Sequence, residues 1–172
     1  MDTRATGLNH VSIVARDLAE STRFYVEVLG LSVVPTPDFG FPVQWLEVDG
    51  QQVHLFERQD EAPVSAHLAL EVDDFLAVYE QARQLGVLDR TTFGYAVAEL
   101  PGGEAQLYLR DPAGNLVEID HPDGAAASER IDEMIVLAER RPQPDGPVPR
   151  LPLKSRTGPA PTKVAAQPRV RS

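Results

Sequence analysis

The stretch Leu8-Asn-His-Val-Ser-Ile-Val-Ala-Arg-Asp17 decides the fold, because a similar stretch returns as Ser65-Ala-His-Leu-Ala-Leu-Glu-Val-Asp-Asp74. Each stretch has a His near the start of an alternating strand pattern and ends in acids that can cap a helix. His10 and His67 are 57 positions apart, and so are Asp17 and Asp74. A similar pattern at a fixed interval indicates an internal repeat. The sequence therefore predicts two copies of one small unit.

A helical pattern and three short strands follow each of these stretches. Apolar residues recur at helical spacing, and the two helical patterns stop at Gly30 and Gly86. The strands expected next are 31–35, 43–48 and 52–57 in the first unit, with Asp49-Gly50 as a hairpin turn, and 95–100, 105–110 and 116–120 in the second. We therefore expect an α+β fold in which two βαβββ modules, residues 7–58 and 65–122, form a concave mixed β-sheet.

The repeated pattern ends at residue 122, and the composition of the remaining residues differs from that of the two modules. Apolar residues between 128 and 139 recur at helical spacing, which predicts a C-terminal helix within residues 123–141, laid on the body or on a partner chain. Residues 142–172 hold eight of the fifteen prolines and show no apolar periodicity, which is typical of a disordered or extended tail. This tail has six basic residues and one acid, so it either has no partner or meets an acidic or membrane surface.

Length and composition narrow the function classes. A chain of 172 residues suits one domain, here residues 1–122, with a short extension. The absence of cysteine excludes disulfides, thiolate ligands and a Cys nucleophile, and it makes the cytoplasm the default location. No signal peptide is visible, and no apolar run approaches the roughly 20 residues of a membrane span. The net charge of −10 with a basic tail leaves an acidic body, which disfavours nucleic acid as a partner.

Strand alternation places four metal-ligating side chains on the face of the strands that points away from the helices. His10 and His67 lie on the first strand of each unit, and His54 and Glu118 lie on the last. Pseudo-twofold packing of the units would bring all four together. Imidazole and carboxylate ligands suit Fe²⁺, Mn²⁺, Ni²⁺, Co²⁺ or Zn²⁺. The sequence thus predicts one divalent metal ion, with His54 as either a fourth ligand or a catalytic side chain.

Further residues are expected around this site. Tyr108 precedes Glu118 by ten positions on the adjacent strand, where its phenol could orient a substrate oxygen, pass a proton or form an apolar wall. The rest of the expected substrate pocket is Ser12, Gln44, Leu46 and Gln106. His121, beside Pro122, and Glu57 are expected at the surface.

These motifs resemble the vicinal oxygen chelate superfamily, which is the glyoxalase/bleomycin resistance protein/dioxygenase family. The resemblance lies in residues 8–18, Phe24-Tyr25 and Val28-Leu29-Gly30-Leu31, and again in residues 66–73 and 108–119. It implies that His10, His67 and Glu118 correspond to the recurrent metal ligands of that family. His54 falls where glyoxalase I has a metal-binding Glu and methylmalonyl-CoA epimerase has a Gln.

The resemblance implies three functions. The first is a divalent-metal-dependent enzyme of the glyoxalase or isomerase type, with His54 or Glu118 as the base. The second is a non-haem Fe(II) extradiol-type dioxygenase with His10, His67 and Glu118 as its facial triad. The third is a non-catalytic protein that binds a small molecule such as an antibiotic. The family also implies a homodimer, and Ala98 and Ala127 near the phosphonate-clamp positions disfavour fosfomycin as the substrate.

Overall fold

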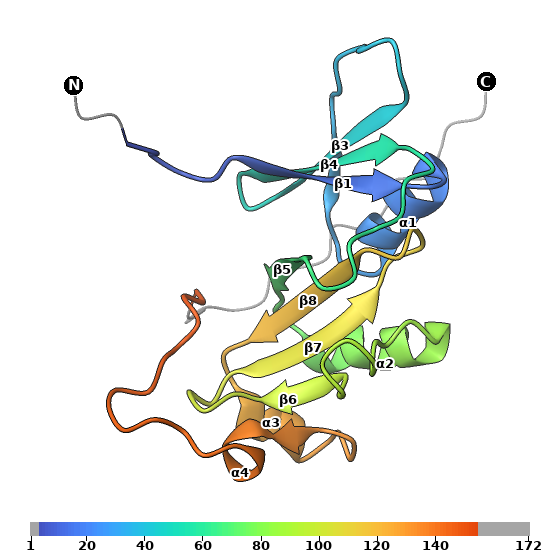
Figure 1. Cartoon of the computed structure of the whole chain (residues 1–172). Helices are drawn as coiled ribbons and strands as arrows, with labels where there is room; N and C mark the ends of the chain where they lie inside the picture. The colour runs from blue at the N-terminus through green and yellow to red at the C-terminus, as the bar shows by residue number, and fades with distance from the viewer. Residues whose placement is uncertain (1–3, 155–172) are drawn as a thin grey trace.

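Two copies of a strand–helix–three-strand unit follow each other along the chain (Figure 1). The computed structural model describes residues 4–154. The first half consists of β1 (His10–Ala15), α1 (Leu18–Glu27), β2 (Ser32–Val34), β3 (Val43–Val48) and β4 (Gln51–Glu57). The second half consists of β5 (His67–Glu71), α2 (Phe75–Leu85), β6 (Val97–Glu99), β7 (Ala105–Arg110) and β8 (Leu116–His121). The predicted repeat of two βαβββ units is thus confirmed.

Each half builds its own sheet, with the same strand order. The first sheet runs β1-β4-β3-β2, and the second runs β5-β8-β7-β6 with one further strand, β9 (Ile135–Val136), at its edge. In both, the first strand pairs in parallel with the last strand of its own unit. Within each half, therefore, the first strand lies beside the last strand. These are the strands that carry the predicted metal ligands.

The helix starts and the tight turn follow from local chemistry. Asp17 accepts a hydrogen bond from the backbone N–H of Glu20 at 2.8 Å, and Asp74 accepts one from Ala77 at 3.0 Å. These caps satisfy N–H groups that a helix start leaves without partners. Asp49 and Gly50 have φ angles of 51° and 77°, the left-handed geometry of a two-residue hairpin. That turn fixes the register between β3 and β4.

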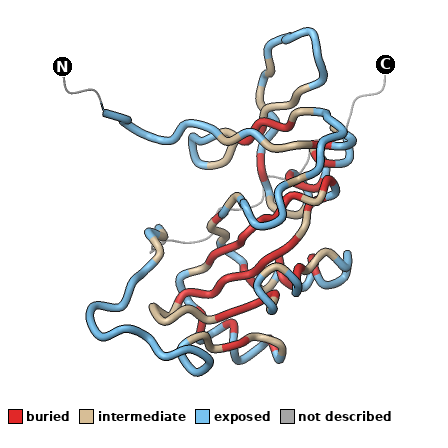
Figure 2. The backbone as a smooth tube through the Cα atoms, viewed as in Figure 1, coloured by how far each residue is buried: buried red, intermediate tan, exposed pale blue. Residues whose placement is uncertain are grey.

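The two halves differ in burial (Figure 2). In β7 and β8 all residues but the last of each strand are buried, whereas β1 is exposed at alternate positions. The core of both halves includes Tyr25, Leu55, Leu107 and Ile119. The second sheet is therefore the better covered of the two.

The predicted C-terminal helix over 128–139 is wrong. That region holds two short helices, α3 (Gly124–Ser128) and α4 (Leu137–Arg140), with β9 just before the second. β9 pairs in parallel with β6. The free edge of β6 offers unpaired backbone groups, and pairing with them outweighs the helical preference of this apolar segment.

A buried contact between side chains joins the two halves. Asp111, in the turn between β7 and β8, accepts a hydrogen bond from the Tyr25 hydroxyl of α1 at 3.0 Å. The side-chain amide of Asn115 in the same turn donates to the carbonyl of Val14 in β1 at 2.7 Å. We call Tyr25, Asp111 and Asn115 the junction. It holds β1 of the first half beside the turn of the second.

Part of the basic tail also touches both halves. Residues 142–154 form no helix or strand, but the backbone N–H of Lys154 donates to Glu71 at 2.8 Å, and its ammonium pairs with Asp49. The acidic surface that meets this cation is therefore the chain's own. Residues 155–172 of the predicted tail lie outside the described residues. Among residues 4–154, no helix is long and apolar enough to cross a membrane.

Candidate metal centre

Two of the four candidate ligands, His67 and Glu118, lie in direct contact in the second half. Nε2 of His67 lies 3.2 Å from Oε2 of Glu118. Nδ1 of His67 lies 2.9 Å from the carbonyl oxygen of Ser65, so it carries the proton and leaves Nε2 as the free acceptor. A carbonyl that holds the remote nitrogen in this way is the usual support of a metal-ligating histidine. Glu118 is only 6 % exposed.

His10 and His54 lie together in the first half. Their rings stack with centroids 4.3 Å apart, and the indole of Trp45 stacks on the other side of His54 at 4.4 Å. Nδ1 of His10 lies 2.6 Å from the side-chain oxygen of Asn9, which leaves Nε2 of His10 free. Nε2 of His54 lies 2.8 Å from Oε1 of Gln52. Since that amide oxygen can only accept, His54 keeps Nδ1 as its free acceptor.

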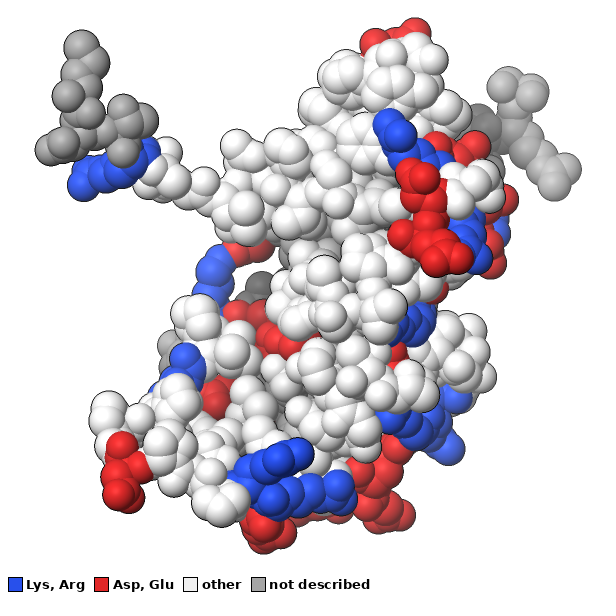
Figure 3. Space-filling view, in the orientation of Figure 1, with Lys and Arg blue, Asp and Glu red and all other residues white. Residues whose placement is uncertain are grey.

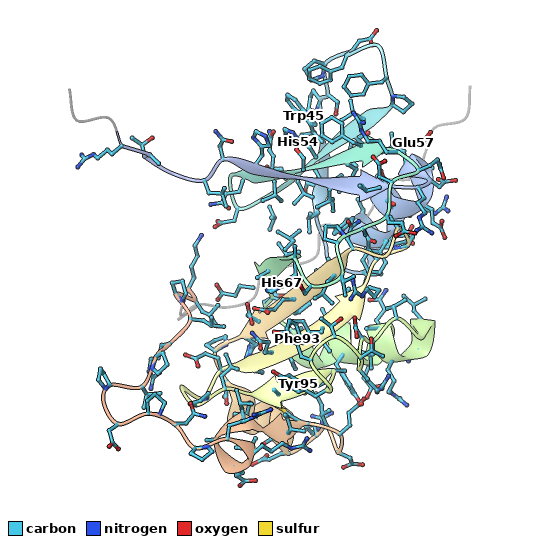
Figure 4. All side chains as sticks on the ribbon, viewed as in Figure 1. Trp45, His54, Glu57, His67, Phe93 and Tyr95 are labelled. Atoms are coloured by element: carbon cyan, nitrogen blue, oxygen red, sulfur yellow. The ribbon has the colours of Figure 1, made fainter. Side chains whose placement is uncertain are left out.

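The four candidate ligands thus form two pairs, one in each half, and the chain does not bring the pairs together (Figure 4). Within residues 4–154, no three His, Cys, Asp or Glu side chains lie close enough to hold one metal ion. Alternation correctly predicted which face each ligand occupies, but convergence of all four is not seen within one chain.

Burial sets the electrostatics of both pairs. Burial lowers the pKa of His54, and the neighbouring His10 lowers it further, so the imidazole of His54 is neutral at pH 7. Burial raises the pKa of Tyr108, and the nearby Glu118 adds to this effect. The Tyr108 hydroxyl donates to Gln106 at 2.9 Å. These shifts leave a neutral base in the first half and a neutral phenol in the second.

Asp120 is a site acid that the sequence analysis did not single out. It is 4 % exposed and lies two residues after Glu118 on the same face of β8. Burial, followed by the charge of Glu118, raises its pKa to about 8. The site face of the second half therefore has two carboxyl groups, where the comparison of the two repeats predicted only Glu118.

A pocket of about 540 Å³ lies between the two halves. Ser12 of β1 and His67 of β5 both line it, so the structure places Ser12 where a pocket residue was expected. Most of the remaining lining is apolar, and it includes Val14, Phe56 and Leu116. Figure 3 shows acidic side chains within the hollow between the upper and lower parts of the molecule.

The predicted positions of two pocket residues, Gln44 and Leu46, are wrong. Leu46 is fully buried in the core and pairs with Val53, and Gln44 pairs with Leu55, so both lie on the helix side of the sheet. Trp45, which pairs with His54, takes the site side instead. The hairpin register explains which residues of β3 face the site. Because the turn at Asp49-Gly50 has two residues, Trp45 is paired with His54 and lies on the same face of the sheet.

Other aromatic side chains were missed, because they lie in loops or on a strand of uncertain phase. Phe93 packs on Tyr108 with a centroid distance of 4.6 Å, and Tyr95 lies 6.1 Å from the same ring. Glu57 is exposed as predicted, and it accepts from the N–H of Leu18 at the start of α1. His121 is partly exposed at the end of β8 and accepts from the N–H of Asp123.

The paired modules and the placement of the histidines define the vicinal oxygen chelate class of fold. The family model that matches residues 7–119 is that of the Glyoxalase/Bleomycin resistance protein/Dioxygenase superfamily, and the chain belongs to this superfamily. A relative in sequence is Glyoxylase I 4 of Arabidopsis thaliana, which is 27 % identical over 140 residues that cover 75 % of this chain and 78 % of the relative.

Two solved structures share the fold. A glyoxalase family protein from Bacillus anthracis matches with a TM-score of 0.56 and 23 % identity, over 70 % of this chain and 98 % of the other. Lactoylglutathione lyase from Agrobacterium tumefaciens matches with a TM-score of 0.51 and 22 % identity, over 69 % of this chain and 95 % of the other. At these identities the structural matches establish the fold alone.

Proposed function

We propose that the chain is a divalent-metal-dependent enzyme of the glyoxalase or isomerase type, acting on a small substrate that presents two oxygens to the metal. The observation that carries this proposal is the His67–Glu118 pair. Adjacent ligand atoms around a metal with bonds of about 2.1 Å lie roughly 3.0–3.4 Å apart, and this pair is separated by 3.2 Å. The buried carboxylate and the oriented imidazole therefore fit Fe²⁺, Mn²⁺, Ni²⁺, Co²⁺ or Zn²⁺.

We infer that a second copy of the chain completes the site. The His10–His54 pair and the His67–Glu118 pair occupy different halves, and the junction holds those halves in place. In a twofold dimer, the first half of one subunit would face the second half of the other, and two equal sites would result. The family resemblance supports the same homodimer.

The chain's own residues suit proton transfer beside a chelated substrate. When bound, a divalent ion would act as a Lewis acid and stabilise negative charge on a substrate oxygen. Neutral His54, oriented by Gln52, can accept a proton at Nδ1. Glu118 is the other candidate base, and the phenol of Tyr108, held by Gln106, can orient a substrate oxygen. These roles support the proposal of an isomerase-type site.

One observation favours a second candidate function, an Fe(II) dioxygenase of the extradiol type. Nε2 of His54 is hydrogen-bonded to Gln52, and with its Nδ1 kept for proton transfer the ligands are His10, His67 and Glu118, which are two histidines and one carboxylate. That set is the facial triad of non-haem iron oxygenases. Turnover with Ni²⁺, Co²⁺ or Mn²⁺ in the absence of oxygen would support the isomerase, and oxygen uptake with Fe²⁺ would support the dioxygenase. The remaining alternative is a binding protein without turnover.

Metal content tests the proposed ligands directly. Protein purified without oxygen is expected to hold about one divalent ion per chain, and His67→Asn and Glu118→Gln are each expected to lower this content at least tenfold. His121→Asn is the matched control, since His121 lies on the same sheet and takes no part in the pairs. Full metal content in both ligand variants would contradict the proposal, as would a wild-type chain that retains no metal.

Co-production of two inactive variants tests the shared site. His10→Asn and His67→Asn each remove one ligand from both sites of a homodimer. In a mixed dimer, however, one site keeps all its ligands. An equal mixture should therefore regain about one quarter of the wild-type metal content. No recovery in a verified mixed dimer would show that each site belongs to a single chain.

A further inference from the structure

All three nitrogens of the Arg110 side chain are hydrogen-bonded in the second half. Nε of Arg110, at the end of β7, donates to Asp89 at 2.6 Å, and Nη1 donates to the carbonyl oxygen of Gly114 at 2.9 Å. Nη2 donates to the carbonyl oxygen of Val64 at 2.7 Å and to the hydroxyl of Thr92 at 2.6 Å. One planar guanidinium therefore joins three segments that are separate in the sequence.

The carboxylate of Asp89 fixes this guanidinium in place. Asp89 is buried, and its Oδ1 accepts hydrogen bonds from the N–H groups of Thr91 and Thr92 at 2.7 and 3.0 Å. Its Oδ2 accepts from Arg110 and from the Thr92 hydroxyl, the latter at 2.7 Å. Because both oxygens are bound, the carboxylate has one orientation, and an ionised pair of this kind makes strong hydrogen bonds. We call Asp89 and Arg110 the anchor.

The two carbonyl groups that Arg110 holds lie where the two ligand-bearing strands of this half begin. Val64 comes three residues before His67, the first residue of β5. Gly114 comes four residues before Glu118 of β8. β5 and β8 pair in parallel, so the two strands start side by side. The bonds from Arg110 therefore restrain where both strands begin, and with this the 3.2 Å separation of the two ligand atoms.

The backbone before β5 depends on such a bond, because packing holds it weakly. Val64 is 77 % exposed. The next carbonyl along the chain, that of Ser65, accepts a hydrogen bond from Nδ1 of His67 at 2.9 Å. The anchor thus restrains the residue next to the one that orients the imidazole. A fixed carbonyl at Nδ1 keeps Nε2 directed at Glu118.

A second connection from the anchor to His67 runs through Phe93. Phe93 follows Thr92, which the anchor binds, and the ring of Phe93 meets the imidazole of His67 edge-on with centroids 6.3 Å apart. Figure 4 shows both side chains in the lower part of the view. The anchor therefore restrains both a polar and an aromatic contact of the imidazole.

The first half supports its ligand pair differently. Counted along the paired strands, the position of β3 that corresponds to Arg110 of β7 is Glu47. Glu47 accepts a hydrogen bond from the N–H of Gly50 in its own turn, and His10 is bonded to the side chain of its neighbour Asn9. The first pair is thus held by adjacent residues, whereas the second is held from a distance by the anchor.

We propose that the anchor positions the second ligand pair: it holds His67 and Glu118 at the spacing of two metal ligands before a metal ion binds. The inference rests on the proposed function, since only a site that takes a metal gives this spacing a purpose. Ligands that are already in place lose little conformational freedom when the ion arrives. Arg110 and Asp89 are therefore positioning residues of the proposed metal centre.

Arg110→Lys tests the anchor, because a lysine keeps the positive charge beside Asp89 but lacks the fork that reaches both strand starts. The matched control is Arg90→Lys. Arg90 forms a two-bond pair with Glu133 in the same half, with both distances 2.7 Å, and neither bond reaches a ligand strand. In metal-free protein, amide hydrogen exchange over residues 63–68 should be faster in Arg110→Lys than in the wild type and unchanged in Arg90→Lys.

Metal binding is the second readout. Titration of the full-length, metal-free chain with Co²⁺ should give about tenfold weaker binding in Arg110→Lys, with a changed visible spectrum of the bound ion, and wild-type values in Arg90→Lys. Thr92→Val removes only one hydroxyl from the anchor and should shift exchange and affinity in the same direction by a smaller amount. This milder variant decides the question if Arg110→Lys does not fold.

Wild-type Co²⁺ affinity in Arg110→Lys and Thr92→Val would overturn the proposal, and so would unchanged exchange over residues 63–68 or equal losses in Arg110→Lys and Arg90→Lys. Full metal content in His67→Asn and Glu118→Gln would overturn the proposed function instead. The two failures are distinguishable, because a site that fails only the first test still loses its metal when a ligand is replaced.

Discussion

The two halves share one topology but differ in how they are covered. In the second half, α3 packs near β6 and β7, β9 pairs with the edge of the sheet, and the site acid Glu118 is 6 % exposed. Within residues 4–154 the first half has no such additions, and its site face keeps the partly exposed Phe39 and Phe41. The duplicated unit therefore yields one self-covered half and one open half. The open half is the one that a substrate or a second subunit has most reason to cover.

The largest expected effect comes from breaking the junction between the halves. The carboxylate of Asp111 accepts four hydrogen bonds, from Tyr25, Ala113 and twice from Asn115, and the residue is 4 % exposed. Asp111→Ala would leave buried donors without partners and is expected to cost about 3–5 kcal/mol of the free energy of unfolding. Urea unfolding followed by Trp45 emission and by circular dichroism measures this loss.

The same experiment shows how strongly the halves depend on each other. In the wild type the two signals should change together, whereas in Asp111→Ala the first half, reported by Trp45, should unfold before the rest. Tyr25→Phe removes one hydrogen bond only and should cost about 1 kcal/mol. Coincident transitions and a cost below that of Tyr25→Phe would mean that the junction does not couple the halves.

A smaller effect is expected from a carboxylate that fastens the second half. Asp89 accepts hydrogen bonds from Thr91 and Thr92 and pairs with Arg110 at 2.6 Å. Burial alone would raise the pKa of Asp89, but the hydrogen bonds from Thr92 and Thr91 outweigh it and lower the pKa. The stabilisation is therefore fully present above the unfolded-state pKa of about 4 and is lost as the pH falls below it.

Asp89→Asn should accordingly cost about 1.5–3 kcal/mol at pH 7 and clearly less at pH 3, as measured by urea unfolding at both pH values. The control in the first half is Asp38→Asn, since Asp38 makes a single exposed hydrogen bond to Gly40. Its effect should stay within about 0.5 kcal/mol at either pH. An equal cost of Asp89→Asn at pH 7 and pH 3 would rule out an ionised Asp89 as the cause.

The smallest expected effect concerns the tail contact that touches both halves. Lys154 and Asp49 are both largely exposed, with 70 % and 66 % of their side-chain surface accessible, and exposed pairs contribute little. Lys154→Glu should change the free energy of unfolding by less than about 0.5 kcal/mol, or the thermal midpoint by less than about 2 °C. A larger shift would show that this segment fastens the two halves together.

Much of the fold could be predicted from the sequence, because the signals are local and occur twice. The two His-containing strands, the caps at Asp17 and Asp74 and the hairpin at Asp49-Gly50 each depend on a few neighbouring residues. The segment 128–139 failed because its structure depends on a distant partner, the free edge of β6. A helical pattern does not reveal that such an edge is available.

The candidate site divides in the same way. The faces of His10, His54, His67 and Glu118 follow from strand alternation, which is a local rule. Gln44 and Leu46 were placed wrongly because apolar residues occupy both faces of β3, so alternation alone does not fix the phase. Whether the two ligand pairs meet depends on how the halves pack and on a second chain. Neither is encoded in the pattern of a single strand.

The junction also makes the two repeated units unequal, because the contacts between them come from a turn that only the second unit has. In the first half β3 and β4 are connected by the two residues Asp49 and Gly50, whereas the equivalent connection in the second half spans residues 111–115 and reaches across to α1 and β1. The turn that makes these contacts therefore belongs to the second half alone. A circular permutant that begins with the second half would keep these contacts, because they depend on position in space. A tandem of two first halves would lose them.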